Sequence, residues 1–340
     1  MKYFKKITAV ACIAAMLVCC FSFSASALVF EEGDFGYEIN TYTKEMTLVK
    51  YTGSDSTVTI PGTYDVYPVT KLAKSALSGN TQLQVLNIPT TMYKIDSGAL
   101  SDCTSLSAIR FPAYITSIGK EVCLNCTSLQ TAYVYASIDK LPAYSFTGCR
   151  ELTNVDLNNS ITEIGTYAFQ DCSSLTNIGF LSQITSIGRC AFDGTGISSL
   201  YVPEGLTVIP DYAFSNCADL EYAEIPGSVT SISETAFYND PKLILGVYKD
   251  TPGHQYAVNN MIDHIVLDGA KYGDVNGDGT VDILDSTEIQ KFAAEKTDFT
   301  DEQFEMADVN KDDFADVMDA LLIQKYAIGK YDIPPIIIRY

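Results

Sequence analysis

Hydrophobic residues return every 23 positions through the middle of the chain. The leading apolar residue of each unit, with one step of 22, stands at Leu83, Leu106, Leu129, Leu152, Leu175, Ile197, Leu220 and Leu243. Within a unit, alternate strand residues point to opposite faces, so Val155 and Leu157 share a face while Asn154 and Asp156 point away. A single unit cannot bury its apolar residues alone. The pattern therefore predicts stacked coils with parallel strands about 4.8 Å apart, a β-rich solenoid.

The repeat is bounded by segments with a different pattern. Residues 37–61 alternate like a hairpin and predict a β cap, which we place over residues 28–61. Residues 246–269 predict a short helix and a last strand, and we place this closing cap over residues 243–268. The solenoid is then expected over residues 62–242.

Cysteines recur in step with the units. Cys103, Cys126, Cys149, Cys172 and Cys217 share one column, with Thr195 at the matching place in the shortened unit. A disulfide ladder is one interpretation. Buried thiols are favoured, because stacked Cβ atoms lie about 4.8 Å apart and a disulfide prefers roughly 3.8 Å. Cys123 replaces the Phe of an "AF" pair and should be buried too, whereas Cys190 is off the column at a position compatible with exposure.

The units resemble the BspA-like class of leucine-rich repeats, found mainly in bacterial surface and secreted proteins. The resemblance rests on the motif "V-x-I-P-x-x-V-T-x-I-x-x-x-A-F-x-x-C" and covers roughly residues 58–242. It implies the same fold class that the period predicts, a leucine-rich-repeat solenoid with 23-residue coils.

The N-terminus has the features of a secretory signal peptide over residues 1–27. Lys2, Lys5 and Lys6 precede a short apolar run, and Ala25 and Ala27 stand at small-residue cleavage positions. Cleavage is expected after Ala27, and an uncleaved membrane anchor is the alternative. Seven of the ten cysteines would remain, so at least one thiol could not pair within a monomer. The mature protein is expected to be secreted, extracellular and without a membrane span.

The chain is acidic, with a net charge of −20. Residues 273–340 carry 16 Asp and Glu against 6 Lys and Arg, a net of −10. Such a surface repels nucleic acid and anionic lipid, so neither is expected as a partner.

Residues 274–285 and 308–319 repeat one acidic pattern, "DVNGDGTVDILD" and "DVNKDDFADVMD". An EF-hand-type loop supplies calcium ligands from positions 1, 3, 5, 7, 9 and 12, with Gly at position 6. Position 6 is Gly279 in the first loop and Asp313 in the second, and Asp adopts the left-handed backbone at some cost. Two Ca²⁺ ions are predicted, although chance acidic loops are the alternative. The predicted ligands are Asp274, Asn276, Asp278, Thr280, Asp282 and Asp285, then Asp308, Asn310, Asp312, Phe314, Asp316 and Asp319, with Thr280 and Phe314 using their carbonyls.

The two loops depart from ordinary EF-hands in three ways. Asp rather than Glu stands at position 12, no strong helix precedes the first loop, and one helix follows each loop. Two such units 34 residues apart resemble a type I dockerin, a small all-α calcium-binding domain, here over residues 273–333. A linker over 269–272 and a tail over 334–340 would flank it.

That resemblance implies docking onto a cohesin domain of a cellulosome scaffold. The family's contact positions, 10, 11, 17 and 18 of each unit, fall here on Ile283, Leu284, Gln290, Lys291, Val317, Met318, Gln324 and Lys325. Core positions are the alternative for Ile283 and Val317. Both units keep "IQK", which implies pseudo-twofold symmetry, and the family sometimes docks in either of two orientations.

No catalytic residues are predicted. The chain has only two histidines, His254 and His264, and no phosphate loop or serine elbow. We therefore expect a non-catalytic binding protein whose solenoid presents a protein- or carbohydrate-binding surface, including Tyr133 and Tyr201 on the outward strand face. Ordinary amphipathic surface is the alternative for the tyrosines. An enzyme or enzyme inhibitor with a site on the solenoid is the alternative for the whole protein.

Overall fold

The computed structural model describes residues 28–176, 184–267, 272–310 and 312–329. The predicted signal peptide, most of the predicted linker and the predicted tail lie outside these residues.

An antiparallel sheet opens the described chain, as the alternation predicted. Its strands are β1 (Leu28–Glu32), β2 (Phe35–Asn40) and β3 (Glu45–Tyr51). β3 then pairs in parallel with β6 (Tyr67–Leu72), which also pairs with the two-residue β5 (Thr63–Tyr64). The cap sheet thus continues directly into the coils, and its inner residues Tyr37, Met46 and Leu48 join the solenoid core.

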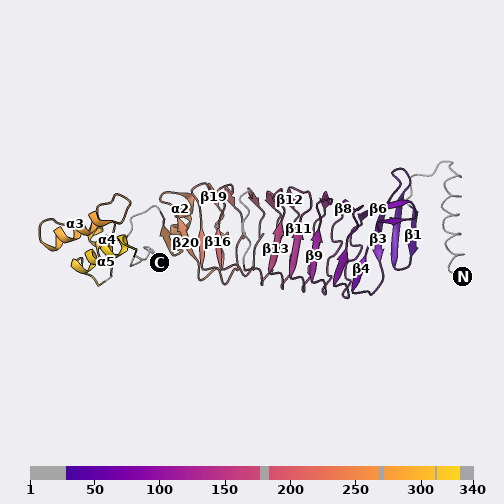
Figure 1. Cartoon of the computed structure of the whole chain (residues 1–340), viewed down its shortest axis with the longest axis horizontal. Coiled ribbons are helices and arrows are strands. Elements are labelled where there is room, and N and C mark those ends of the chain that lie inside the picture. Colours follow the sequence, from indigo (N-terminus) through magenta and orange to yellow (C-terminus); the bar gives the residue numbers. More distant parts are fainter. Residues whose placement is uncertain (1–27, 177–183, 268–271, 311, 330–340) are drawn as a thin grey trace.

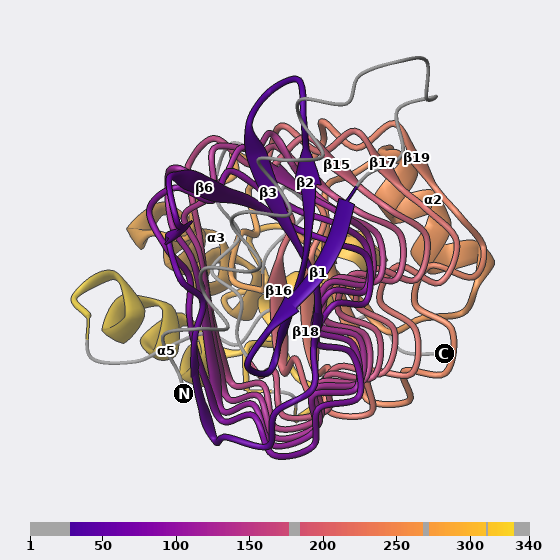
Figure 2. The same ribbon diagram turned by 90° about the vertical axis from the view of Figure 1, so that its right-hand side faces the viewer.

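Most of the described coils contribute one strand to a long parallel face (Figure 1). Successive strands are offset by the 23-residue period, so Tyr133 pairs with Arg110 on one side and with Asp156 on the other. Figure 2 shows the coils nearly superimposed when viewed along the stack. The strands of this face are β4 (Thr57–Thr59), β7 (Val85–Asn87), β9 (Ala108–Phe111), β11 (Thr131–Val134), β13 (Asn154–Leu157), β16 (Ser199–Tyr201), β18 (Tyr222–Glu224) and β20 (Ile244–Val247).

A second column of two-residue strands runs beside the first: β8 (Lys94–Ile95), β10 (Ser117–Ile118), β12 (Lys140–Leu141), β14 (Glu163–Ile164), β15 (Ser186–Ile187), β17 (Val208–Ile209) and β19 (Ser231–Ile232). After it most coils turn through two residues of positive φ, four positions apart, such as Tyr167 (58°) and Asp171 (57°). Backbone bonds to the next coil continue through this turn, as from Asn125 N to Thr147 O at 2.8 Å. The coil geometry is therefore fixed by inter-coil hydrogen bonds as well as by apolar packing.

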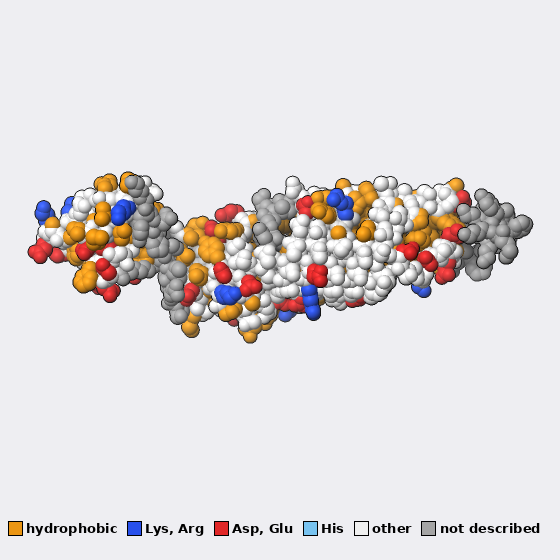
Figure 3. All heavy atoms as spheres, turned by 60° about the horizontal axis from the view of Figure 1, so that its bottom comes forward, with side chains coloured by type: hydrophobic (Ala, Val, Ile, Leu, Met, Phe, Trp, Pro, Cys, Tyr) orange, Lys and Arg blue, Asp and Glu red, His pale blue; other side chains and the backbone are white. Residues whose placement is uncertain are grey.

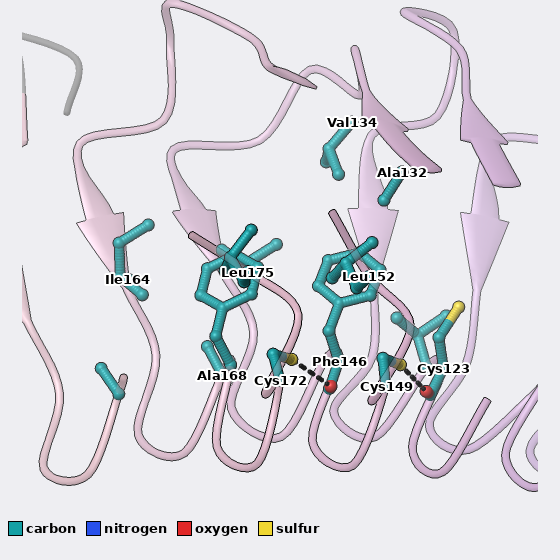
Figure 4. Packing of buried hydrophobic residues seen from close by; sticks show 14 of the residues in the cluster. Cys123, Ala132, Val134, Phe146, Cys149, Leu152, Ile164, Ala168, Cys172 and Leu175 are labelled. Carbon is teal, nitrogen blue, oxygen red and sulfur yellow. Dashed lines mark hydrogen bonds between the residues drawn. The ribbon is translucent and has the colours of Figure 1, made fainter. Parts of the chain in front are cut away.

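Aromatic rings and thiols stack through the core. Phe146, Phe169, Phe192, Phe214 and Phe237 form a ladder with centroids 5.4–5.6 Å apart. Each thiol of the cysteine column donates to a backbone carbonyl 25 or 26 residues earlier, as from Cys149 Sγ to Cys123 O at 3.2 Å (Figure 4). All seven described cysteines are free and buried, so the buried-thiol interpretation is confirmed and the disulfide ladder is wrong.

Two burial expectations need correction. Cys190 is buried, with 5% of its surface exposed. It occupies the positive-φ position that the larger Tyr167 and Tyr212 occupy in the coils before and after it, and Tyr167 interacts with its side chain. Val155, expected to be a buried core residue on the same strand face as Leu157, is only partly buried, as is Leu157.

A helix and a final strand close the stack, as predicted. α2 (Pro252–Asn259) starts with Thr251 as N-cap, and β21 (His264–Val266) pairs in parallel with β20. Tyr256 of α2 packs 6.0 Å from Phe237, ending the aromatic ladder. The cap thus supplies apolar cover that a further coil would otherwise provide.

The C-terminal unit is helical, with α3 (Ile283–Ala293), α4 (Asp301–Ala307) and α5 (Val317–Ala327). It has its own core, separate from that of the solenoid, formed by Val275, Ile289, Ala307, Val309, Ala315, Ala320 and Ile323. The helices after the two loops were predicted, whereas α4 was missed. Its start carries a signal that could have found it, a capping box of Thr300 and Gln303.

Candidate calcium loops, docking faces and solenoid surface

The first acidic loop is wound by its own side chains. Asp274 Oδ2 accepts a hydrogen bond from Gly279 N at 3.0 Å, and Asn276 Oδ1 accepts one from Asp278 N at 2.8 Å. Asp278 Oδ1 accepts from both the backbone N and the hydroxyl of Thr280, and these bonds lower the pKa of Asp278. The predicted ligands of this loop are therefore brought onto one tight turn.

The second loop repeats this winding. Asp308 Oδ2 accepts from Asp313 N at 2.9 Å, and Asp312 Oδ1 accepts from Phe314 N at 3.0 Å. Asp313 has a φ of 68°, against 86° for Gly279 at the same position. The expected left-handed conformation of Asp313 is confirmed, and the second loop carries its strain.

Position 12 ties each loop to the helix that follows. Asp285 Oδ1 accepts from Val275 N and Asn276 N, while its Oδ2 accepts from Asp282 N. Asp282 in turn caps the helix by accepting from Leu284 N at 2.7 Å. Asp319 and Asp316 make the same bonds in the second unit. A short Asp fits here because the carboxylate must reach the loop backbone and the N-cap together.

Both position-12 carboxylates are fully buried, and burial raises the pKa of Asp285 and of Asp319. Asp274 and Asp308 add to these shifts by like-charge repulsion. At neutral pH this concentrated negative charge favours a cation at the loop.

The first loop also carries an unsatisfied oxygen. Among the described residues, Asp274 Oδ1 is buried without a hydrogen-bond partner, whereas Asp308 Oδ1 accepts from Asp312 N at 3.1 Å. Within the described ranges no three His, Cys, Asp or Glu side chains gather as a ready-made metal cluster. Hard calcium ions also accept amide and backbone oxygens, which these loops supply. The donor set and the orphaned oxygen fit calcium in the first loop.

The predicted docking residues lie at the starts and outer faces of α3 and α5. Ile283, Leu284, Val317 and Met318 are each more than half exposed, so the core alternative for Ile283 and Val317 is wrong. Gln290, Lys291 and Lys325 are exposed as well. Gln324 differs, since its Nε2 donates to Ser286 Oγ at 2.9 Å across the α3–α5 contact. Figure 3 shows hydrophobic side chains exposed on this helical unit, at the left of the view.

On the solenoid, Tyr133 is not a free ring. The Arg110 guanidinium lies 4.6 Å from the centroid of Tyr133 and 5.3 Å from that of Tyr135, and the Tyr135 hydroxyl donates to Asp156. Arg110 and Tyr133 also line a hollow of about 390 Å³ with Val85, Ile88, Pro112 and Tyr114. We call Arg110, Tyr133, Tyr135 and Asp156 the first aromatic cluster. Arg110 was not among the predicted site residues.

Tyr201 stands in a second, more open cluster on the same face. It is 63% exposed, and its ring centroid lies 6.0 Å from that of Tyr222. Glu224 accepts from the hydroxyls of Tyr222 and Tyr248 at 3.4 and 3.3 Å. We call Tyr201, Tyr222, Glu224 and Tyr248 the second aromatic cluster.

The histidines sit together in the closing cap, with ring centroids 5.3 Å apart and His264 fully buried. Among the described helices, none combines the length and apolar character that a membrane crossing needs.

Family models match both parts of the chain. The BspA type leucine rich repeat region matches residues 56–153 and 139–247, and the dockerin type I domain matches residues 272–327. No curated protein matches.

Solved structures of leucine-rich repeat proteins are similar to this chain. A leucine rich cell surface protein from Faecalibacterium prausnitzii is 24% identical, with 65% of this chain and 76% of that chain covered and a TM-score of 0.45. A leucine-rich repeat protein from Bacteroides ovatus is 21% identical, with 64% and 71% covered and a TM-score of 0.49. With more than half of its length matched by the repeat model, the chain belongs to the BspA-type leucine-rich repeat proteins, and it carries a type I dockerin domain.

Proposed function

We propose that this protein is an exported, non-catalytic binding protein that attaches through its dockerin to a cohesin domain of a cellulosome scaffold. The observation that carries the proposal is the pair of exposed apolar dipeptides, Ile283-Leu284 and Val317-Met318, each at the end of a calcium-type loop. An exposed apolar pair on a small acidic domain is costly in water unless a partner covers it.

Two calcium ions would hold the docking faces in place. Type I dockerins bind calcium, and here each loop shares position 12 with the first turn of a docking helix. In each loop the oxygens at positions 1, 3, 5, 7, 9 and 12 would hold one ion. Removing the ion leaves buried carboxylates uncompensated, which should loosen the helix start as well as the loop.

Calorimetry with a scaffold cohesin from the same cell tests the attachment. We expect saturable 1:1 binding in calcium and its loss in excess chelator, with recovery when calcium is restored. A protein with the helical unit deleted serves as the control for binding by the solenoid. Failure of the full chain to bind any cohesin of the scaffold contradicts the proposal.

Export can be tested separately. Cleavage after Ala27 should leave Leu28 as the first residue of protein recovered from culture medium, which N-terminal sequencing checks. Protein that keeps residues 1–27 and sediments with membranes would favour the anchor interpretation instead.

We further propose that the solenoid's strand face binds carbohydrate through its two aromatic clusters. Each cluster combines tyrosine rings, which can stack on a sugar ring, with a carboxylate that can accept a sugar hydroxyl bond. A protein ligand is the other candidate, since tyrosines also anchor protein partners.

Affinity electrophoresis against a panel of neutral and acidic polysaccharides distinguishes the ligand classes. Tyr201→Ala should weaken retention, and Tyr42→Ala, an exposed tyrosine in the N-terminal cap, is the matched control. Equal retention of both variants and the parent contradicts a site at the second cluster. Release of reducing ends from the same panel would support the alternative that the solenoid is catalytic.

A further inference from the structure

The two docking faces are not equivalent, although the sequence relates them by a 34-residue shift. Thr280 corresponds to Phe314, and Thr287 corresponds to Leu321. Phe314 is 67% exposed and Leu321 is 40% exposed, while their counterparts are hydroxyl-bearing threonines. The second unit therefore shows two large apolar side chains where the first shows none.

These residues extend the predicted contact pair into one surface. Phe314, Val317, Met318 and Leu321 follow the spacing i, i+3, i+4 and i+7, which places them along one side of the loop and the first two turns of α5. Val317 and Met318 are 61% and 51% exposed. We call these four residues the second face, and Thr280, Ile283, Leu284 and Thr287 the first face.

The polar rims differ as well. On α3 the Lys291 ammonium is already paired with Glu288, at 2.7 Å. On α5 Leu322 stands at the place of Glu288, so no carboxylate lies three residues before Lys325. A partner that docks on the second face meets a lysine without that internal competitor.

A third difference concerns the glutamines of the two "IQK" motifs. Gln324 is held by Ser286, whose hydroxyl donates to Ala320 O at 3.1 Å. Ala320 takes the place of Ser286 in the second unit, so it offers no hydroxyl to Gln290, which is exposed. Ordering Gln324 against a partner costs less side-chain entropy, because it is already restrained.

We infer that the cohesin is bound in one preferred orientation, on the second face. The inference rests on the proposed attachment to a scaffold. The partner surface it requires is an apolar patch that covers Phe314 and Leu321, with a carboxylate placed to meet Lys325. Apolar area at the centre of an interface, with a charged group at its rim, is the arrangement that gives most binding energy.

Matched pairs of variants in the full chain test the preference. Val317→Asp with Met318→Asp should weaken cohesin binding at least tenfold more than Ile283→Asp with Leu284→Asp, measured by calorimetry in saturating calcium. Phe314→Thr with Leu321→Thr, which gives the second face the residues of the first, should weaken binding roughly tenfold or more. Helical circular dichroism in calcium verifies that each variant is folded. If the double variants do not fold, cohesin binding by Phe314→Thr alone provides the test.

Equal losses from the two aspartate pairs would leave the attachment intact and overturn the single preferred orientation. A larger loss from the first pair would overturn it as well. Absence of binding by the unaltered chain overturns the attachment and this inference together.

Discussion

Asp240 is the last rung of the cysteine column, and its Oδ1 accepts a hydrogen bond from Cys217 N at 2.8 Å. It follows Cys217 by the 23-residue period, so a carboxyl group stands where the earlier coils place a thiol. Its Oδ2 is buried and makes no hydrogen bond with the described residues. Burial raises the pKa of Asp240 from 3.8 to about 7, with a further contribution from Asp193.

This raised pKa predicts a stability that falls as pH rises. Between about pH 4 and 7 the folded protein keeps a proton that the unfolded chain has lost, so the free energy of unfolding decreases across that window. Asp240→Asn should remove the dependence and become the more stable form at pH 8. Denaturant unfolding from pH 5 to 8 measures it, with the exposed Asp219→Asn as control. A stability difference between Asp240→Asn and the parent that does not grow with pH would contradict this.

The buried thiols should be unreactive in the native state. Burial raises the pKa of Cys103 and of Cys217 to about 12, so the nucleophilic thiolate is scarce at pH 8. Alkylation with iodoacetamide should leave the cysteines at positions 103–217 unmodified until denaturant is added, and peptide mass spectrometry reads each site. Fast modification of the native column, or peptides joined by disulfides, would count against it.

The close approach of one coil to the preceding coil should depend on glycine at position 165. A Cβ on Gly165 would lie 2.5 Å from Ala143 N and 2.7 Å from Leu141 O, both backbone atoms of the preceding coil. Gly165→Ala should therefore destabilise the protein by about 1–3 kcal/mol, as overpacking commonly does. In Gly62→Ala the nearest contact is 3.5 Å, so that variant should unfold close to the parent. Equal stability of the two variants would show that the coils can move apart.

The second calcium loop should tighten when its strain is relieved. Asp313→Gly removes the cost of a left-handed non-glycine residue, about 1–2 kcal/mol, which corresponds to roughly a fivefold to thirtyfold gain in affinity. Calorimetric titration of the full chain with calcium should resolve the change in calcium affinity at the weaker of two sites. A single site in the parent protein, or a loss of affinity in Asp313→Gly, would oppose this prediction.

The sequence by itself determined the features that repeat. A residue such as Leu152 or Cys149 packs against a residue of the same type in the neighbouring coil. A period in the sequence therefore predicts which residues are buried. The acidic loops could be predicted equally well, because the side chains of residues 274–285 form hydrogen bonds within one local turn. The continuation of the cysteine column into Asp240 was also present in the spacing, although only the structure showed its unpartnered oxygen.

Tertiary structure decided the features in which neighbouring units differ. Tyr133 lies beneath Arg110 and Tyr201 is open, although both occupy one column, because the neighbours one coil away differ. Likewise Gln324 turns toward Ser286 while Gln290 remains exposed, since Ala320 lacks a hydroxyl. Periodicity fixes where a side chain stands, but its exposure depends on the size and polarity of side chains distant in sequence, which only the folded chain brings into contact.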